Sequence, residues 1–419
     1  MFRIEFEVDD ATFRHAQRGN VAALRAAVQH APYPPAAAAG KYKAWLALLL
    51  RVAAVNDWPD AVRFLLDAAA TPDAVNFHHR HTPACYRRPL EYAAAAGSTL
   101  AVTVLLAAKA DTGTWRDAGH PKNALMCAAR ERQLRSVRTL LAFKAEVHWI
   151  ELKEAATCPG NVAVVRAFLA QVVGTRGSLG HYYDAAHLLA DAAKVRRNAG
   201  VVRLLLNAKA SPNYGEALRS AAGLACGHGF GYPFFPRIAT LRLLLWAGAD
   251  LYLQRHKDLF VDASKYTLVP VVRAMLDAGA DVNASSQQFG RNHQTALHAA
   301  IGHAGCSCGK PITEENTATR VALMNLLIAH KADLQARDCA RRTPLTLAAT
   351  GEYCEQSEFS CTEWSPAMEA FNKTHRDAVV LCLVRAKAVV DPRASDHVQY
   401  RVRDAVERAG IRAGIRRAI

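Results

Sequence analysis

The sequence predicts an all-α protein, a solenoid of helix-turn-helix repeats. Three observations lead to this prediction: a closing phrase that recurs along the chain, an aliphatic pair at a fixed distance before it, and a short Ala-rich segment further upstream. The chain has 419 residues, which is more than one hydrophobic core usually holds. Repetition at a period of roughly 20–50 residues explains that length without several unrelated domains.

The closing phrase consists of two aliphatic residues, two further residues, Lys or Gly, then Ala and an acidic residue. Its clearest copy continues as Ala-Gly-Ala-Asp-Val-Asn from Ala278 to Asn283. An opening copy uses Ala27-Val28 as its aliphatic pair, which brings the total to about ten. The clearest copy ends at Asp281, and the remaining copies end at Asp111, Glu146, Ser211, Asp250, Asp333 and Val389, with weaker ones at Thr71 and Gly174.

The aliphatic pair before each phrase predicts the second helix of a unit. Val201-Val202 and Val271-Val272, with the aliphatic residues that follow them, place apolar side chains at i, i+3 and i+4. Four residues before the pair there is often Gly, which suits a tight turn between two antiparallel helices. Upstream of that turn, paired alanines predict a short first helix that lets neighbouring units approach closely.

The openings of these first helices resemble a known repeat. Thr295-Ala-Leu-His-Ala-Ala and Thr343-Pro-Leu-Thr-Leu-Ala-Ala resemble the Thr-Pro-Leu-His-x-Ala opening of the ankyrin repeat family. Gly279-Ala-Asp-Val-Asn resembles its closing turn, and the resemblance extends over residues 12 to 391 or so. It implies that His298 makes a structural hydrogen bond between units. It also implies that short β-hairpins connect the units, and that partners bind at the tips of these hairpins and on the exposed face of the first helices.

The chain departs from the family at the closing turn. Lys replaces the usual Gly in half of the copies, at a position where the backbone is expected in the left-handed helical region. A side chain there costs up to ~1 kcal/mol, and a cation at a helix carboxyl end offsets part of that cost. The positions are Lys109, Lys144, Lys209, Lys331 and Lys387.

The domain organisation follows from this register. We expect one repeat array over residues 1–394, degenerate near 151–214, and a basic C-terminal capping helix over 395–419. Long insertions at 226–236, 302–318 and 350–374 all fall between the two helices of a unit, so they should leave the array on one edge. Gly174, Gly177 and Gly180 make 171–183 the expected place for a break in the stack.

The composition favours a soluble intracellular protein without catalytic activity. The formal net charge is +15, and the ten cysteines have no framework spacing, which is typical of a reduced compartment. The longest apolar run, Ala44 to Leu50, is far shorter than the about 20 residues that span a bilayer. No catalytic or nucleotide-binding motif is present. We therefore expect a monomeric, cytoplasmic protein that is not an enzyme and carries no cofactor, with a nuclear location left open.

Two interpretations remain open for four cysteines in the insertions, Cys306, Cys308, Cys354 and Cys361. Because the insertions leave adjacent units at the same place, four thiolates could meet as tetrahedral zinc ligands. Their spacings are not those of usual zinc sites, so the prediction is free loop cysteines and no metal.

The predicted function is a scaffold that binds a protein partner, an acidic segment, through its concave face and hairpin tips. Aromatic and cationic residues at the tips match the composition of interface hot spots. The alternatives are electrostatic binding of nucleic acid or an anionic membrane surface, and a role as substrate adaptor for a ubiquitin ligase or kinase. The predicted contact residues are Phe77, His79, Arg80, Trp115, Arg116, Trp149, Tyr214, Tyr252, Arg255, His256, Lys257, Phe289 and Arg291.

Overall fold

The computed structural model describes thirteen stretches of the chain, and every structural statement below concerns these residues. The described stretches contain twenty-one helices and one two-stranded hairpin. Contacts divide the chain into an N-terminal half, Met1–Ala210, and a C-terminal half, Ser211–Ile419, which are described separately. The stretches are 10–30, 39–74, 88–113, 115–117, 120–176, 183–213, 216–224, 236–251, 258–286, 293–301, 314–350, 366–390 and 395–408.

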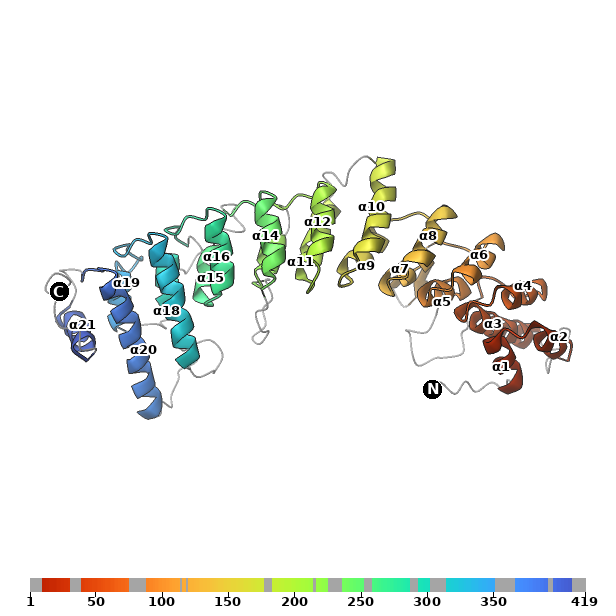
Figure 1. The fold of residues 1–419 in the computed structure, drawn as a ribbon, viewed down its shortest axis with the longest axis horizontal. Helices are drawn as coiled ribbons and strands as arrows, with labels where there is room; N and C mark the ends of the chain where they lie inside the picture. Colours follow the sequence, from red (N-terminus) through yellow and green to blue (C-terminus); the bar gives the residue numbers. More distant parts are fainter. Residues whose placement is uncertain are drawn as a thin grey trace. The chain divides into compact units, whose positions relative to one another are not determined.

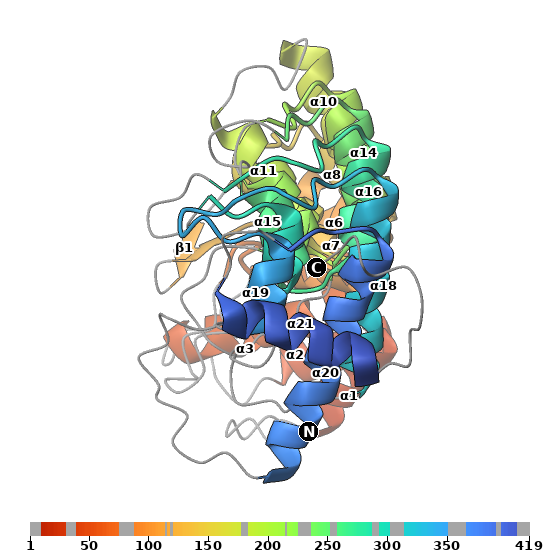
Figure 2. The same cartoon turned by 90° about the vertical axis from the view of Figure 1, so that its left-hand side faces the viewer.

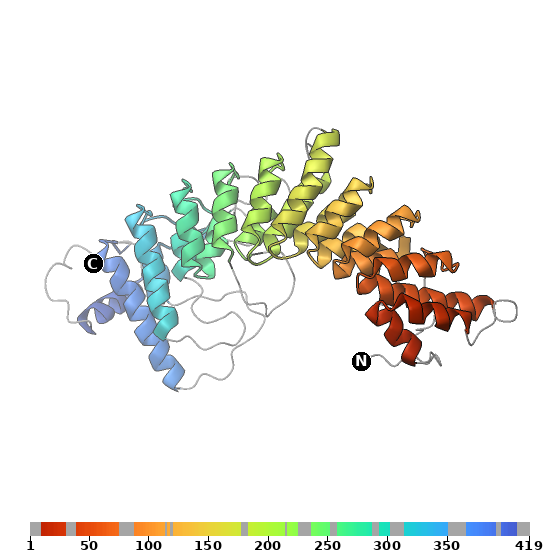
Figure 3. The same cartoon turned by 45° about the vertical axis from the view of Figure 1, so that its right-hand side comes forward.

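The N-terminal half is a stack of helix pairs (Figures 1 and 3). First helices pack on first helices in the order α1, α3, α5, α7, α9, α11, and second helices pack on second helices from α2 to α12. The elements are α1 (Asp10–Arg18), α2 (Val21–Gln29), α3 (Ala39–Val55), α4 (Pro59–Asp67), α5 (Pro89–Ala96), α6 (Thr99–Ala107), β1 (Trp115–Asp117), β2 (His120–Lys122), α7 (Ala124–Arg130), α8 (Leu134–Ala142), α9 (Trp149–Thr157), α10 (Val162–Arg176), α11 (Tyr183–Lys194) and α12 (Ala199–Asn207).

The C-terminal half repeats the arrangement and adds a last helix. Figure 2, which looks along the stack, shows α14, α16 and α18 on one side and α15 and α19 on the other. Helix α14 packs on α16 and α16 on α18, and α21 packs against α19 and α20. The elements are α13 (Ala217–Ala221), α14 (Ile238–Trp246), α15 (Leu259–Lys265), α16 (Val269–Asp277), α17 (Ala296–Ile301), α18 (Glu314–Ala329), α19 (Pro344–Thr350), α20 (Pro366–Arg385) and α21 (Asp396–Arg408). The all-α helix-turn-helix repeat that the sequence predicts is therefore the observed fold class.

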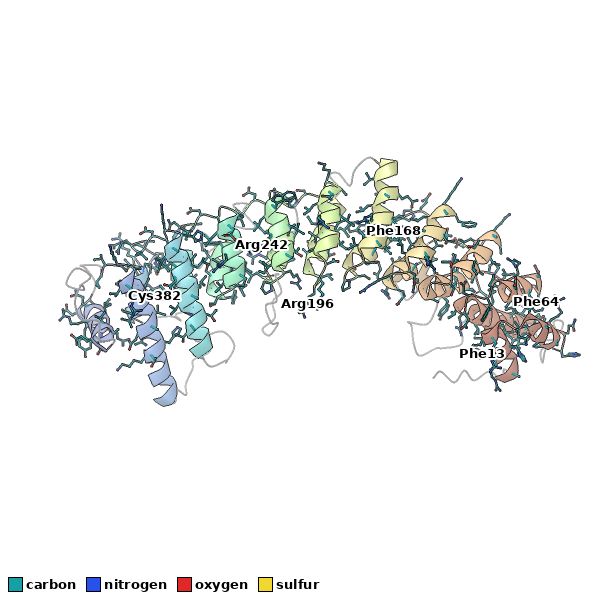
Figure 4. The ribbon with its side chains drawn as sticks, in the orientation of Figure 1. Phe13, Phe64, Phe168, Arg196, Arg242 and Cys382 are labelled. Atoms are coloured by element: carbon teal, nitrogen blue, oxygen red, sulfur yellow. The ribbon has the colours of Figure 1, made fainter. Side chains whose placement is uncertain are left out.

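The core lies between the helix pairs. Val201 and Val202 of α12 are fully buried, as are Val271 and Val272 of α16, which confirms the apolar stripe of the second helices. Phe168 of α10, also fully buried, is among the largest side chains in this core (Figure 4). Burying a Val, Leu or Phe side chain contributes about 1.5–3 kcal/mol, so each pair depends on its neighbours for stability.

Hydrogen bonds also join successive pairs in the N-terminal half. The residue just before three of the second helices, α6, α10 and α12, reaches back to a carbonyl near the end of an earlier first helix. Ser98 Oγ donates to the Val55 carbonyl at 2.7 Å, and Asn161 Nδ2 donates to the Ala129 carbonyl at 2.8 Å. Asn198 Nδ2 donates to the Ala156 carbonyl at 2.8 Å and to the Ala192 carbonyl at 3.0 Å. We call these bonds the turn ladder. It gives partners to carbonyls that a helix end would otherwise leave unsatisfied.

We predict that Asn198→Ala lowers the free energy of unfolding by ~1–3 kcal/mol, because two buried carbonyls lose a donor. Chemical denaturation followed by circular dichroism measures this change. Asn207→Ala, on the exposed end of α12, is the matched control and should stay within ~0.5 kcal/mol of the parent. Equal effects of the two substitutions would contradict a stabilising turn ladder.

The closing turns have the left-handed backbone that the sequence predicts. Gly279 has φ of 86°, and Lys144 has φ of 62° in the equivalent position. The same conformation is found at Lys109, Lys209, Lys331 and Lys387, with φ of 61°, 67°, 65° and 70°. Five lysines therefore carry the steric cost of a Cβ in a conformation that Gly adopts freely.

Lys144→Gly should raise the free energy of unfolding by up to ~1 kcal/mol, because it removes that steric cost. Arg138→Gly, in the exposed middle of α8, should lower it by a similar amount, since Gly is a poor helix former. Urea titration of both variants checks the prediction. It fails if Lys144→Gly unfolds at the same or a lower urea concentration than the parent.

Two of the predicted insertions are partly helical, which corrects their boundaries. Helix α18 begins at Glu314 and α20 at Pro366, so both begin inside the regions assigned to insertions 302–318 and 350–374. They have 16 and 20 residues, whereas α14 and α16 have nine each. Acidic residues at the start of α18 and Pro at the first position of α20 favour helix beginnings there. Residues 225–235, 302–313 and 351–365 lie outside the described part.

The boundary between the halves follows Ala210 and does not fall in 171–183. Helix α10 continues through Gly174 to Arg176, residues 177–182 lie outside the described part, and α9 packs on α11 and α10 on α12. One glycine inside a helix costs only ~1 kcal/mol, which the long apolar α10 outweighs. At the other end of the chain, α21 buries Val398, Val402 and Val406, and residues 409–419 are not described.

Candidate partner-binding surface

The short strands β1 and β2 form one of the connections between helix pairs. They are antiparallel, with Trp115 opposite Lys122, Arg116 opposite Pro121 and Asp117 opposite His120. Trp115 and Arg116 therefore lie in a β-hairpin between α6 and α7, which is the kind of connection that the sequence predicts.

A second connection has a comparable base. Ser285 and Thr295 form an antiparallel bridge, and the Ser286 N–H donates to the Gln294 carbonyl at 2.9 Å. This base brackets the predicted contact residues Phe289 and Arg291, which lie in 287–292, outside the described residues. The hairpin base thus brings both ends of that segment to the start of α17.

The third connection is held by an ion pair. Arg342 Nε lies 2.9 Å from Asp338 Oδ2, and the Asp338 carboxylate is fully buried. The Asp338 N–H donates to the Arg342 carbonyl at 3.1 Å, and Arg341 takes a left-handed conformation with φ of 59°. Among the arginines of this tip, Arg342 therefore stabilises the turn, whereas Arg337 and Arg341 are exposed.

Successive connections are joined by a second set of hydrogen bonds, which we call the loop ladder. Asn213 Oδ1 accepts from the Asp250 N–H and Asn283 Oδ1 accepts from the Asp333 N–H, both at 2.7 Å. In the N-terminal half, Asp73 Oδ1 accepts from the Asp111 N–H at 2.9 Å. Each of these three bonds ties one loop to the next one in the same half, which fixes the spacing of those tips along the stack.

Asp111 also has an electrostatic role at its loop. The Gly113 N–H and the Arg88 guanidinium, at 2.8 and 2.6 Å, both stabilise the charged carboxylate and lower the pKa of Asp111. Arg88 lies just before α5 and Asp111 lies just after α6, so the contact joins the two ends of the α5–α6 pair.

His298 makes the structural contact that the family resemblance implies. Its side chain is fully buried. Its Nε2 lies 3.1 Å from the Arg342 carbonyl, and its Nδ1 lies 2.9 Å from Thr295 Oγ1. A carbonyl can only accept, so Nε2 carries the proton and Nδ1 accepts from the hydroxyl. Burial, the largest effect, lowers the pKa of His298 and keeps the ring neutral.

His375 makes a related contact between the two longest helices of the C-terminal half. Its Nδ1 lies 2.6 Å from Thr317 Oγ1 of α18. Burial, with a contribution from nearby Arg320, lowers the pKa of His375 to about 4. The N-terminal extensions of α18 and α20 are therefore joined by a histidine that stays neutral at physiological pH.

This histidine should make stability depend on pH. Below about pH 6.5 the unfolded chain binds a proton at His375, while the folded chain stays neutral down to about pH 4. Stability should therefore fall as the pH is lowered from 6.5 to 4, by up to ~1.4 kcal/mol per pH unit from this group. His375→Gln should show a shallower decline over that window in thermal unfolding. An unchanged slope would argue against the prediction.

The first helices of the N-terminal half carry paired charges on their exposed side. Arg130 of α7 lies 2.6 Å from Glu154 of α9, and Lys153 of α9 lies 3.4 Å from Asp191 of α11. Nearer the N-terminus, the Arg51 guanidinium lies over the Tyr92 ring, 5.1 Å from its centroid. These contacts cross from one helix pair to the next, so this surface has both signs of charge.

Three of the predicted contact residues, Trp115, Arg116 and Trp149, lie in the described part of the chain. Trp149 is the half-buried first residue of α9, and Trp115 and Arg116 are placed by their backbone in β1. Outside the described residues lie Phe77, His79, Arg80, Tyr214, Tyr252, Arg255, His256, Lys257, Phe289 and Arg291, together with Cys306, Cys308, Cys354 and Cys361.

One large apolar residue that the sequence analysis did not single out is Trp246, at the end of α14. Its side chain is 86% exposed, the most among the exposed large hydrophobic residues of the described stretches. The equivalent position holds Ala142 in α8 and Asn207 in α12, so its outward direction could have been inferred from the repeat register.

No family model matches this chain, and no curated protein matches it. Among solved structures, it is similar to the crystal structure of the human ASB11 ankyrin repeat domain. The similarity has 17% sequence identity and a TM-score of 0.33, and covers 65% of this chain and 96% of that chain. The fold class follows from the helix pairs themselves. In the described part of the chain, no helix is both long and apolar enough to cross a membrane.

Proposed function

We propose that this protein is a non-catalytic scaffold that binds an acidic segment of a protein partner through its hairpin tips and the exposed face of its first helices. The loop ladder is the observation that carries the proposal. Asn213 and Asn283 each tie their own loop to the next one at 2.7 Å, so these loops form a frame from which side chains can vary without altering the fold.

The chemistry of the tips supports a protein partner. Trp115, Arg116 and Trp149 lie at or beside connections of the N-terminal half, and Tyr252, Arg255, His256 and Lys257 occupy one segment of the C-terminal half. Aromatic and Arg side chains provide most hot spots in protein interfaces. The net charge of +15 favours acidic segments over basic ones.

Substituting Arg255, His256 and Lys257 together with Ser should weaken partner binding at least about tenfold without lowering the melting temperature. Affinity purification from native lysate, with the parent and the variant as bait, identifies proteins that the parent retains and the variant loses. A variant that retains the same proteins would exclude these three residues from the interface.

The matched control replaces Lys373, Arg385 and Arg403, exposed cations of α20 and α21, and should retain the partner. If instead all retained material is lost on nuclease treatment, or consists of anionic lipid, electrostatic binding of nucleic acid or membrane replaces the proposal.

A further inference from the structure

Seven of the second helices in the described part carry an exposed arginine at one register position. It is the residue directly after a buried aliphatic residue: Arg138 follows Val137 in α8, Arg166 follows Val165 in α10, and Arg203 follows Val202 in α12. The same position holds an exposed Arg in four other second helices: Arg25, Arg63, Arg242 and Arg273. Figure 4 labels Arg242, on α14.

Packing fixes the direction of these arginines. In α8, Val137 before Arg138 and Leu140 after it are fully buried. In α12, Val202 and Leu205 are fully buried in the same way. The arginine between them must therefore project away from the core. Because α8 packs on α10 and α10 on α12, and packed helices lie about 8–10 Å apart, Arg138, Arg166 and Arg203 form a row with a step on the order of 10 Å. We call these three residues the arginine row.

The charges of the row are not neutralised by the helices that carry them. Helices α8, α10 and α12 contain no Asp or Glu, and none of the three arginines forms an ion pair with another described residue. Glu131 and Glu146, the nearest carboxylates along the chain, lie in the turns before and after α8. The surface over these helices is therefore positive, with Arg135 of α8 adding a further exposed cation.

Two contrasts within the same half show that the row is distinct. On α4, Arg63 at the same register position lies 2.6 Å from Asp60, and on α2, Arg25 lies over the Phe64 ring at 5.3 Å. On the first helices, Arg130 and Lys153 face carboxylates of the next helix pair. The arginines of α8, α10 and α12 thus have no such partner among the described residues, whereas those at the same position of α2 and α4 do.

We infer that the arginine row is a second docking surface, which binds an acidic protein segment whose carboxylates repeat about every 10 Å. An acidic α-helix with Glu at every seventh residue has that step, since seven residues rise about 10.5 Å. Arg suits the role because its guanidinium binds a carboxylate with two parallel hydrogen bonds.

The spacing of the row favours a protein segment over nucleic acid. Double-stranded DNA carries a charge about every 1.7 Å, which one cation per ~10 Å would leave largely unmatched. Proteins that bind single strands add aromatic side chains on which bases stack. Next to the row, Ala142, Ala163 and Ala170 are exposed and have no ring, and the exposed aromatic residue is Phe143, just after α8. One ring does not provide a platform for successive bases.

The test uses the full chain and a fluorescent helical peptide in which Glu recurs at every seventh residue of an Ala- and Gln-rich sequence. Binding is followed by fluorescence anisotropy at low ionic strength, where surface charges are least screened. Replacing Arg138, Arg166 and Arg203 by Gln should weaken binding at least about tenfold, since three exposed ion pairs with the peptide are lost together. Gln keeps the helix propensity, and circular dichroism verifies that the variant is folded.

The matched control replaces Arg18, Lys43 and Arg63, exposed cations of the same half, and removes the same formal charge. It should bind the peptide within about twofold of the parent. The inference is overturned if control and row variants lose affinity equally, or if a peptide with the same glutamates clustered at one end binds as tightly. Tighter binding of a single-stranded oligonucleotide of equal charge would also overturn it. Because the tip variant at Arg255, His256 and Lys257 leaves the row intact, failure of one surface is distinguishable from failure of the other.

Discussion

Each helix pair of this chain has an apolar stripe that its neighbouring pairs cover. The fully buried pairs Val201-Val202 and Val271-Val272 lie on that stripe. Because the covering surface belongs to the next pair, stability arises from contacts between neighbours more than within any one pair. The short first helices depend on these contacts in particular, since isolated helices of their length are marginal in water.

Polar contacts follow the same nearest-neighbour rule. The turn ladder at Ser98, Asn161 and Asn198 joins consecutive pairs at the helix ends, and the loop ladder at Asn213 and Asn283 joins the connections. Both ladders satisfy backbone groups that the repeat leaves open at helix ends and turns. They also fix the spacing between pairs, which is what allows outward side chains to be arranged at a regular step.

The two surfaces of the N-terminal half differ in how they treat charge. On the first helices, cations pair with carboxylates of the next helix pair, as Arg130 does with Glu154. On the second helices α8, α10 and α12, the arginine row has no such partners among the described residues. The first arrangement strengthens the stack modestly, whereas the second leaves charge available to another molecule. A scaffold with both could hold two partners, or two parts of one partner, on opposite sides of each helix pair.

Much of the architecture was already determined by the sequence alone. The recurring phrase established the helix pairs and their buried positions. The Lys residues at closing turns predicted left-handed backbone, and the Thr295-Ala-Leu-His motif predicted the contact of His298. These features depend on residues close in sequence, or on a register that repeats, so a single sequence is enough to predict them. The predicted tip residues are mostly outside the described part, and their role stays a prediction.

Only the tertiary structure decided the features that depend on which segments meet. The pairing of Arg130 with Glu154 and the contact of His375 with Thr317, 58 positions apart, each require a distance that no local pattern encodes. The boundary after Ala210 and the helical beginnings of α18 and α20 also depended on packing. The three arginines of the row can be read in the sequence. Only the packing of α8 on α10 and of α10 on α12 shows that they lie on neighbouring helices without Asp or Glu.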